Sequence, residues 1–519
     1  MSAAADTPRV VERDPARLVL AGGTSALVGL ATTELLALVL PGSPSPTAAL
    51  ADRIISWAPD GFRETLIGAV GTADKPLLVV GIVLGVVLAG ALVGFLVRAR
   101  RVPWAFAAGA VLAWLACWTG GVQDGIWLAV VLAAGVGAGA LVWTRLVLAT
   151  TRPTLRAAAP DELDRRAFLR LTAVLAAAGA AGVGVAAVVR RGSAAAVDAA
   201  RSAIGLPTPT RPAAPLPAGA DVPGIPPAVT PNADFYQIDT ALVTPAVQTS
   251  DWSLSVSGRV STPLTLTYDE LLALPSVERY VTLTCVSNPV GGDLVGNAKW
   301  QGVLLADVLA QVGVRPDADA LVGVSVDGFT AGFPLSVLSD GREALIAYAM
   351  NDEPLPVKHG FPARLVVPGL YGYVSATKWL TEIRLTTLQE TVPFWLARGW
   401  AADGTIELAS RIDVPRTGTV IVGGTVAVGG RAWHQHRGIE AVQVRVDGGP
   451  WEDATLASDV GDDAWRLWSW QWAATPGPHT LECRARSSDG TWQSEDVHDV
   501  FPGASSGLHR VEVEVGGTA

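Results

Sequence analysis

The sequence has 519 residues, of which 50% are hydrophobic and only 17% are charged. A typical soluble domain has about 25% charged residues, so this shortfall indicates segments that lie in a membrane. The formal net charge is -10 and the chain has no basic stripe, which argues against a nucleic-acid-binding protein. The three cysteines, Cys117, Cys285 and Cys483, lie far apart and form no CxxC pair, so no zinc knuckle or disulfide framework can be read from them.

Five apolar runs dominate residues 1–190, and each is near the length of about 20 residues that a bilayer-spanning helix needs. A soluble protein rarely buries five such helices in succession, so we expect a five-helix transmembrane region over residues 1–191, with the lipid bilayer as a partner. The runs are Leu18–Leu40, Pro76–Val97, Pro103–Thr119, Ile126–Trp143 and Phe168–Val189.

Arginine placement predicts the orientation of these helices, because loops on the cytoplasmic side carry an excess of basic residues. Basic residues gather in the N-terminal tail, after the second run and before the fifth, at Arg9, Arg13, Arg17, Arg98, Arg100, Arg101, Arg145, Arg152, Arg156, Arg165 and Arg166. These three places lie on the same side of the membrane if all five runs span it. We therefore expect a multi-pass protein of the cell membrane with a cytoplasmic N-terminus, and an extracytoplasmic location for everything after Val189.

The segment Arg165-Arg166-Ala-Phe-Leu-Arg170 stands directly before the fifth apolar run and resembles a twin-arginine export signal. Two readings stay open. The pair is either a topological anchor of two adjacent arginines, or a signal for export of a folded C-terminal part. The second reading matters for cofactors, because a domain loaded in the cytoplasm must cross the membrane already folded.

Glu34 is the one carboxylate well inside the apolar runs. Charges inside a membrane are costly and often functional. Its place near the outer end of its run leaves a second reading open, an ion pair with Arg53, Arg63 or Lys75 of the following loop.

Three further regions follow the apolar runs. Residues 192–230 are rich in Ala, Pro, Gly and Thr and predict an extended linker. Residues 231–400 mix strand-like and helix-like patterns, which indicates an α+β domain. Residues 405–519 are mostly strand and turn, and their length suits an immunoglobulin-like β-sandwich. The expected elements are strands at Trp252–Gly258, Tyr280–Thr284, Arg364–Val367, Glu440–Val446, Trp465–Trp472, His479–Arg486 and His509–Val515, and helices at Tyr268–Leu274 and Leu304–Gln311.

Cys285 ends a predicted strand and precedes the glycine pair Gly291-Gly292. A soft thiolate at a strand end beside flexible backbone can bind a soft metal. Taken alone, such a residue is more often a buried core cysteine.

A second segment brings together three cation-capable side chains, His359, Arg364 and Lys378, separated by a buried strand and a glycine-rich turn. Such a turn can direct backbone N–H groups and basic groups toward one anion. Arginine grips a phosphate through two hydrogen bonds, and lysine acts as a point charge. The alternative reading is a turn with solvated charges.

Together the two segments resemble the molybdopterin-binding domain of the sulfite oxidase family, and the resemblance covers about residues 230–519. It implies that the Cys285 thiolate binds molybdenum alongside the dithiolene of the pterin. It also implies a C-terminal immunoglobulin-like domain. The residues to which it assigns cofactor binding are Asn232, Phe235, Tyr236, Cys285, His359, Arg364, Ser375, Ala376, Thr377 and Lys378.

Two departures from the family bear on the substrate. Sulfite oxidases proper carry an Arg-Asn-His run after the aromatic pair, where this sequence has Ile238-Asp239-Thr240. They also carry an active-site tyrosine where this sequence has Trp400. The resemblance therefore implies a depleted sulfite site, with Asp239 and Trp400 as candidate catalytic residues beside Cys285.

The resemblance implies an oxidoreductase with a molybdenum–molybdopterin cofactor (Mo-MPT) that catalyses oxygen-atom transfer, and the apolar runs outside the resemblance imply that this enzyme is anchored in a membrane. Its partners would be a small-molecule oxo donor or acceptor and a separate electron-transfer protein or quinone, with a homodimer left open. A non-enzymatic membrane receptor or scaffold with an immunoglobulin-like outer module is the alternative class. Cys285 together with His359, Arg364 and Lys378 argues against that alternative.

Axial ligands for a haem are scarce in the apolar half. All six histidines lie at His359 or later, and the methionines of the chain are Met1 and Met350. A b-type haem between helices usually needs histidines that face it, with methionine or cysteine as alternatives. Cys117 is the single thiol there. We therefore expect no haem in this chain.

Overall fold

The computed structural model divides into two compact units, residues 1–195 with 240–243, and residues 196–239 with 244–519. Each unit has its own hydrophobic core. The residues that the structure describes are 14–40, 45–57, 74–97, 101–118, 125–149, 160–219, 222, 224–241, 243–422 and 424–516.

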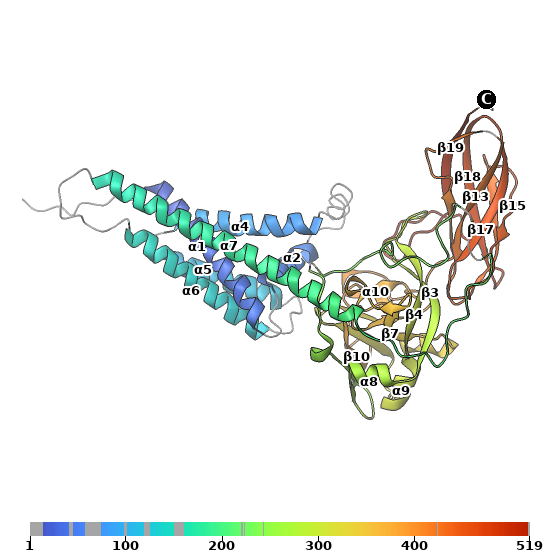
Figure 1. Ribbon diagram of the computed structural model, residues 1–519, viewed down its shortest axis with the longest axis horizontal. Coiled ribbons are helices and arrows are strands. Elements are labelled where there is room, and N and C mark those ends of the chain that lie inside the picture. Colours follow the sequence, from blue (N-terminus) through green and yellow to red (C-terminus); the bar gives the residue numbers. More distant parts are fainter. Residues whose placement is uncertain are drawn as a thin grey trace, which may run out of the picture. The chain divides into compact units, whose positions relative to one another are not determined.

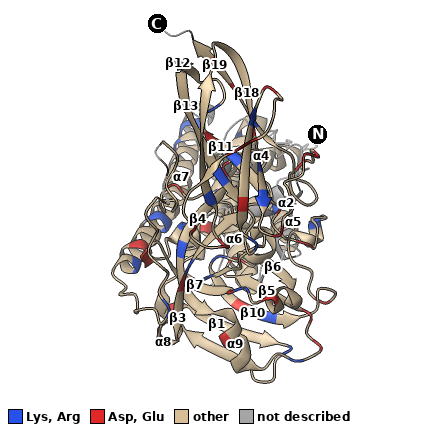
Figure 2. Ribbon diagram, turned by 90° about the vertical axis from the view of Figure 1, so that its right-hand side faces the viewer, with Lys and Arg blue, Asp and Glu red and all other residues tan. Residues whose placement is uncertain are grey.

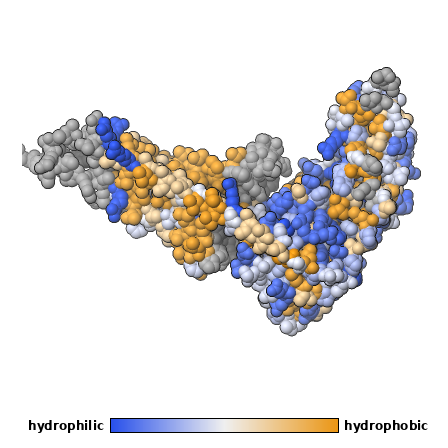
Figure 3. Space-filling model, viewed as in Figure 1, coloured by the Kyte–Doolittle hydropathy of each residue, from blue (hydrophilic) through white to orange (hydrophobic). Residues whose placement is uncertain are grey.

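The first unit is helical and apolar on the face seen in Figure 3. Its helices are α1 (Pro15–Val39), α2 (Pro46–Trp57), α4 (Asp74–Leu96), α5 (Val102–Trp118), α6 (Gly125–Ala149) and α7 (Pro160–Ser202), whose last residues belong to the second unit. Each of the five apolar runs overlaps one helix. Within the described residues, four stretches are long and apolar enough to cross a membrane, Pro15–Val39, Leu77–Leu96, Ile126–Val147 and Arg165–Ser202, whereas α5 has a shorter apolar stretch, Val102–Leu115.

Glycines let α1 pack closely against its neighbours. A Cβ atom at Gly22 would collide with the Gly90 carbonyl of α4, and one at Gly29 would lie 2.8 Å from the Gly135 carbonyl oxygen of α6. Small residues at such contacts allow two helix backbones to approach closely and to gain van der Waals packing energy.

Glu34 is buried and forms an ion pair with Arg190 of α7, with Nη1 and Oε2 2.6 Å apart. The backbone N–H of Thr47 and the hydroxyl of Ser45 also donate to this carboxylate, each at 2.9 Å. Arg190 was not among the expected partners, because residues 156 positions apart in the sequence meet only through helix packing. Arg63 and several of the basic residues used for orientation, Arg9, Arg13, Arg98, Arg100, Arg152 and Arg156, lie outside the described residues.

Two five-stranded sheets and short helices form the middle of the second unit, in the order β3-β4-β7-β8 with β9 beside β7, and β2-β1-β10-β5-β6. The expected strands and helices of this region are confirmed, and Thr267 caps α8 through a capping box with Glu270. The elements are β1 (Ser253–Gly258), β2 (Leu264–Thr267), α8 (Tyr268–Ala273), β3 (Ser276–Thr284), β4 (Val295–Leu304), α9 (Leu305–Val312), β5 (Ala320–Ser325), β6 (Thr330–Pro334), β7 (Leu345–Met350), β8 (Glu353–Pro354), β9 (Arg364–Val366), α10 (Gly372–Ser375) and β10 (Leu380–Thr386).

The proline-rich segment before this region lies along the edge strand β3. Thr210 N donates to Ser276 O at 2.8 Å, and Glu278 N donates to Arg211 O at 2.9 Å. An exposed strand edge invites pairing with other chains, so this segment also protects the edge of the sheet.

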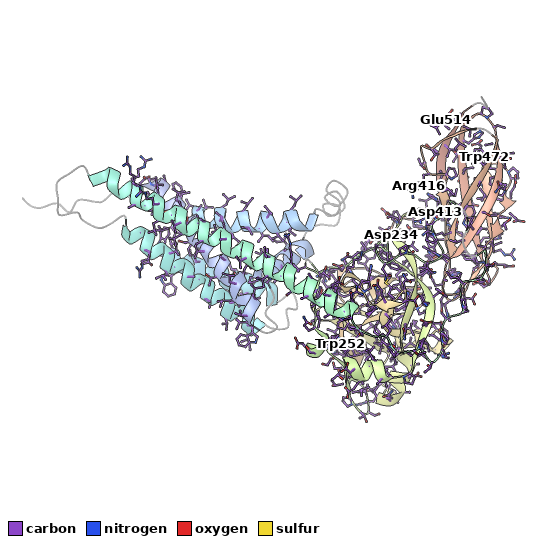
Figure 4. All side chains as sticks on the ribbon, viewed as in Figure 1. Asp234, Trp252, Asp413, Arg416, Trp472 and Glu514 are labelled. Carbon is purple, nitrogen blue, oxygen red and sulfur yellow. The ribbon has the colours of Figure 1, made fainter. Side chains whose placement is uncertain are left out.

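The C-terminal region consists of a four-stranded and a five-stranded sheet, in the orders β11-β13-β17-β16 and β12-β19-β18-β14-β15. Apolar side chains of both sheets share one core, which includes Trp468, Trp472, Leu481 and Cys483. Asp413 lies toward one end of this region and Glu514 at the other (Figure 4). Charges of both signs are interspersed on the described strands (Figure 2). The strands are β11 (Ala409–Val414), β12 (Val420–Val422), β13 (Gly424–Trp433), β14 (Ile439–Val446), β15 (Glu452–Asp453), β16 (Thr455–Leu456), β17 (Arg466–Ala474), β18 (Gly477–Ser487) and β19 (His509–Gly516).

Candidate active site

Cys285 directly follows β3 and begins a tight turn. Its N–H donates to Leu294 O at 2.9 Å, and Asn288 N donates to Cys285 O at 3.0 Å. Burial raises the pKa of the thiol, while hydrogen bonds from Ser287 act in the opposite direction. A thiolate here is therefore favoured only when a positive partner such as a metal ion compensates the lost hydration.

Aromatic rings from three segments gather beside this turn. Phe235 is buried, stacks on Tyr236 at a centroid distance of 5.3 Å, and meets Trp300 and His359 edge-on at 5.9 and 5.6 Å. A Cβ atom at Gly296 would lie 2.7 Å from the Phe235 ring, so β4 admits this ring only because it has glycine there. Burial raises the pKa of Tyr236, and nearby Cys285 raises it further. The predicted residues Phe235, Tyr236, Cys285 and His359 therefore lie in one neighbourhood.

His359 is buried and neutral. Its Nε2 lies 3.0 Å from Asn232 O, and because a backbone oxygen only accepts, Nε2 carries the ring proton. Burial, together with the charges of Arg364, Lys358 and Lys378, lowers the pKa of the imidazole to about 4. His359 can therefore orient the Asn232 segment and accept a hydrogen bond at Nδ1.

Arg364 is 5% exposed, and no carboxylate among the described residues forms an ion pair with it. Its Nη1 donates to His359 O at 3.1 Å, and its guanidinium lies 5.0 Å from the centre of the Trp300 ring. Burial lowers its pKa to about 10. A buried charge without a counter-charge costs several kcal/mol. A bound anion would relieve that cost.

Lys378 and Asp239 form a buried ion pair, with Nζ and Oδ2 2.9 Å apart and side chains 10% and 5% exposed. Lys378 Nζ also lies 3.4 Å from Lys358 O and 4.6 Å from the centre of the Trp379 ring. The predicted cofactor lysine and the predicted catalytic aspartate are thus direct partners. An anionic ligand near Lys378 would therefore meet a lysine whose positive charge Asp239 already compensates.

The hydroxyl groups of the segment before Lys378 form hydrogen bonds with backbone carbonyl groups. Ser375 Oγ donates to Tyr371 O at 2.9 Å, and Thr377 Oγ1 lies 3.4 Å from Gly323 O. Ala376 caps the C-terminus of the short helix α10. These three predicted residues therefore shape the turn, and the hydroxyls of Ser375 and Thr377 are already engaged with backbone.

Trp400 belongs to an aromatic group next to this turn. Its ring centroid lies 5.7 Å from Tyr373, 6.0 Å from Trp395 and 5.4 Å from Phe501. Tyr373 lies two residues from Tyr371, which is within electrostatic reach of Cys285. Trp400 is therefore connected to the surroundings of Cys285 indirectly, through its ring contact with Tyr373 and the proximity of Tyr371 to Cys285.

Sequence reasoning assigned no role to Tyr371 or Glu353. The Tyr371 hydroxyl accepts from Glu407 N at 3.3 Å, and burial and the nearby charge of Glu407 raise its pKa. Glu353 accepts a hydrogen bond from Asn232 Nδ2, which also donates to Met350 O at 3.2 Å. The glycine-rich turn around Tyr371 was a usable signal, whereas the Asn232–Glu353 contact joins positions 121 residues apart and left none.

The arrangement fits a flat anionic group that carries a soft metal. Cys285 offers a soft donor, Arg364 an uncompensated cation, and Phe235 and Trp300 aromatic surfaces. Among the described residues no group of three His, Cys, Asp or Glu side chains gathers in a form that could hold a metal ion. A metal at this site would thus draw most of its ligands from a bound molecule.

Comparisons with known sequences agree with this chemistry. Residues 241–395 match the family model "Oxidoreductase molybdopterin binding domain". The chain is 30% identical over 340 residues to "Sulfite oxidase, mitochondrial" of Mus musculus, across 55% of this chain and 62% of that protein. It is 34% identical over 181 residues to "Uncharacterized oxidoreductase YuiH" of Bacillus subtilis, across 35% of this chain and 87% of that protein. The sulfane dehydrogenase SoxCD from Paracoccus pantotrophus aligns with 55% of this chain and 81% of its own, at a TM-score of 0.48 and 22% identity.

The matched residues contain the chemistry described above. Cys285, His359, Arg364 and Lys378 all fall within residues 241–395. The chain spans 62% of the length of the mammalian mitochondrial sulfite oxidases, so it resembles part of those proteins. Its match to most of the Bacillus oxidoreductase, together with the domain match, settles the class. The chain belongs to the sulfite oxidase family of molybdopterin-dependent oxidoreductases.

Proposed function

We propose that this oxidoreductase is anchored in a membrane, holds Mo-MPT outside the cytoplasm, and transfers an oxygen atom to or from a small neutral molecule. The observation that carries the proposal is the buried guanidinium of Arg364. It lies within electrostatic reach of Tyr236, which in turn is near Cys285, and no carboxylate among the described residues pairs with it. A receptor or scaffold without chemistry is set aside because the chain belongs to a family of oxidoreductases.

Each residue of the site has an assigned part in holding the cofactor. Cys285 supplies the protein's soft ligand to molybdenum, and Arg364 and Lys378 bind the anionic part of the pterin group. Phe235 and Tyr236 cover the ring system, while neutral His359 holds Asn232 in place through Nε2. Ser375, Ala376 and Thr377 contribute through main-chain atoms, because both hydroxyls already donate to backbone. When bound, the cofactor supplies two-electron oxygen-atom transfer.

The charges around Lys378 disfavour sulfite as a substrate. Asp239 neutralises Lys378 and so removes the attraction that this lysine would offer an anionic substrate. Ile238, in the predicted position of an anion-binding arginine, is half-exposed and carries no charge. Trp400, Tyr373 and Trp395 offer aromatic surface, which suits a neutral molecule.

Reduction of an S-oxide or N-oxide is the activity that we prefer. In that reaction the substrate oxide takes up two electrons and two protons and leaves as the sulfide or amine plus water. A separate electron-transfer protein or a quinone supplies the electrons. A homodimer is compatible with this scheme and is not required by it.

The membrane part of the proposal rests on the helices of the first unit. Five helices would span the bilayer, with α5 as the shortest. The N-terminus would be cytoplasmic, and Arg165-Arg166 at the start of the last span would act as a twin-arginine signal for the folded cofactor domain. We further propose domain limits at 191, 230 and 400, an immunoglobulin-like sandwich over 405–519, and no haem.

Turnover of the purified, molybdenum-loaded protein in mild detergent tests the proposal. Reduced methyl viologen serves as donor for dimethyl sulfoxide or trimethylamine N-oxide, and ferricyanide serves as acceptor for sulfite. We expect oxide-dependent viologen oxidation and weak or no sulfite oxidation. Robust sulfite turnover at micromolar substrate would overturn the substrate assignment. A preparation that lacks molybdenum after expression in a cofactor-producing host would overturn the cofactor assignment.

A further inference from the structure

A loop of the C-terminal region reaches the candidate active site. Residues 488–508 connect β18 to β19 (Figure 1). Within this connection His498 and Ser506 pair through two backbone hydrogen bonds of 3.3 and 3.2 Å, which close residues 499–505 into a compact loop. We call it the 499–505 loop. Compact loops with paired ends often carry function.

One end of the 499–505 loop is attached to the Cys285 turn. Ser505 Oγ donates to Asn288 O at 2.6 Å, and Asn288 N donates in turn to Cys285 O at 3.0 Å. Asn288 is itself buried, and its side-chain oxygen accepts from Leu294 N at 2.8 Å. The Ser505 hydroxyl is therefore two hydrogen bonds from the carbonyl of the predicted metal ligand.

The other end of the loop contacts the Trp400 segment. Phe501 meets the Trp400 ring edge-on at 5.4 Å, and Ala401 N donates to Pro502 O at 2.9 Å. Phe501 and Ser505 are four residues apart, so the chain between them spans at most about 14 Å. The loop thus bridges the Cys285 turn and the Trp400 segment across a short distance.

The strands of the C-terminal region support the same turn. The Arg411 guanidinium of β11 donates to Gly292 O, and the His509 ring of β19 packs against Gly291. Gly291 has φ +76, and a Cβ atom there would collide with His509. Residues 288–292 are therefore held by Ser505, Arg411 and His509, all from the C-terminal region.

We propose that the 499–505 loop is a specificity-determining element of the active site. It holds the Cys285 turn against the Trp400 segment and so limits the size of molecules that reach Cys285. This inference rests on the assignment of the Cys285 site in the proposed function. Phe501 and Ser505 act as positioning residues, because they touch the site through Trp400 and Asn288.

Alkylation of Cys285 in the full-length protein tests the proposal without any substrate. The protein is prepared in detergent from a host that makes no molybdopterin, and iodoacetamide labelling of each cysteine is followed by mass spectrometry. Loss of one hydrogen bond shifts a local opening equilibrium about fivefold, so Ser505→Ala should raise the Cys285 labelling rate by about that factor. Phe501→Ala removes the edge-on ring contact with Trp400 and should raise the rate by a similar factor, because an aromatic pair is about as stabilising as one hydrogen bond. Ser505→Thr, which retains the hydroxyl, should restore the wild-type rate.

Matched controls separate loop opening from unfolding. Val497→Ala removes an exposed side chain of the same connection and should leave labelling unchanged. Cys483, buried in the C-terminal core, should stay unlabelled in every variant, because labelling there would report unfolding. If either loop variant unfolds, the other carries the test. Equal Cys285 labelling in wild-type and correctly folded variants would overturn the proposal.

A substrate-size comparison on the loaded enzyme gives a second readout. Phe501→Ala should lower the KM for methyl phenyl sulfoxide relative to the KM for dimethyl sulfoxide. An unchanged KM ratio would count against the loop as the element that sets size. Absence of sulfoxide turnover in the wild type would contradict the proposed function and would leave the labelling result to decide on the loop.

Discussion

At the scale of single residues, Arg364 is the position whose electrostatic energy should differ most between the cofactor-free and the cofactor-bound protein. Its charge is buried against Trp300, and its described hydrogen bonds go to backbone carbonyls. The same charge is a cost in the empty protein and an attraction for an anionic cofactor. Stability and cofactor content should therefore respond in opposite directions to its removal.

Replacement of Arg364 by methionine tests this opposition. Neutral apolar substitutes for buried charges are often stabilising, so Arg364→Met should raise the free energy of unfolding of the cofactor-free protein by about 1 kcal/mol. The same variant should hold less molybdenum per chain after expression in a cofactor-producing host. Denaturant titration and elemental analysis measure the two effects. A variant that keeps wild-type molybdenum content would contradict the anion-binding role.

His509 predicts how stability depends on pH. Burial and the charge of Arg411 together lower the pKa of His509 to about 4, against the opposing effect of Asp413. Its Nδ1 accepts from Ile412 N at 3.0 Å, which requires the neutral ring. Between the unfolded value of about 6.5 and the folded value, the unfolded chain binds more protons, so stability falls as pH falls through this window.

His509→Gln keeps an acceptor and removes the titration. Between pH 7 and pH 5 the wild type should lose about 1–2 kcal/mol more stability than this variant. Denaturant titrations at both pH values, followed by tryptophan fluorescence, provide the comparison. Parallel losses in both proteins would show that His509 is protonated as easily in the fold as outside it.

The roles of residues that stand in one local motif could be predicted from the sequence. Contacts between two segments that are far apart in the sequence could not. Cys285, His359 and Arg364 stand in local motifs, and the structure brings them into one neighbourhood with Phe235 and Tyr236. Their partners come from far along the chain. Asp239 meets Lys378 from 139 positions away, and Ser505 meets Asn288 from 217, which no local pattern can indicate.

At the scale of elements, periodicity predicted where strands and helices occur, because alternation and capping are local properties. The capped helix α8 and strands β14 and β17 are examples. The proline-rich linker differs. Its composition predicted an extended spacer, but the partner that it lies along, β3, is set by tertiary packing.

Helix α7 carries the export prediction. Arg165 and Arg166 are the first residues of its candidate membrane span, Arg165–Ser202. Replacement of both arginines by lysine keeps the positive charge, so a topological anchor should tolerate it and a twin-arginine signal should not. We expect the double variant to block export of the cofactor domain, as measured by protease accessibility in spheroplasts. Normal outer exposure would show that the pair is only a topological anchor.

At the scale of the whole molecule, composition and the order of motifs predicted an apolar helical part followed by a cofactor domain and a β-rich end. They did not indicate that the β-rich end contributes to the Cys285 turn, because its sequence reads as a self-contained region. The contacts of Arg411 and His509 with residues 291–292 make it part of the site.

Whether the chain can deliver electrons by itself depends on whether its helices can bind a haem. With no histidine before His359, the helices lack the usual axial ligands of a b-type haem. The single chain purified in detergent should therefore show no Soret band at near-stoichiometric intensity, and a redox protein that co-purifies in mild detergent should be sought instead. A stoichiometric Soret band from the chain alone would refute this.

The central claim is that the Cys285 thiolate is the protein's ligand to molybdenum, and X-ray absorption at the molybdenum K-edge tests it most directly. Cys285→Ser should show one fewer sulfur neighbour than the wild type and no turnover, while the protein still reaches the membrane. Cys483→Ala, altered in the C-terminal core, should keep the wild-type sulfur shell. An unchanged sulfur shell, or wild-type turnover, in Cys285→Ser would contradict the account.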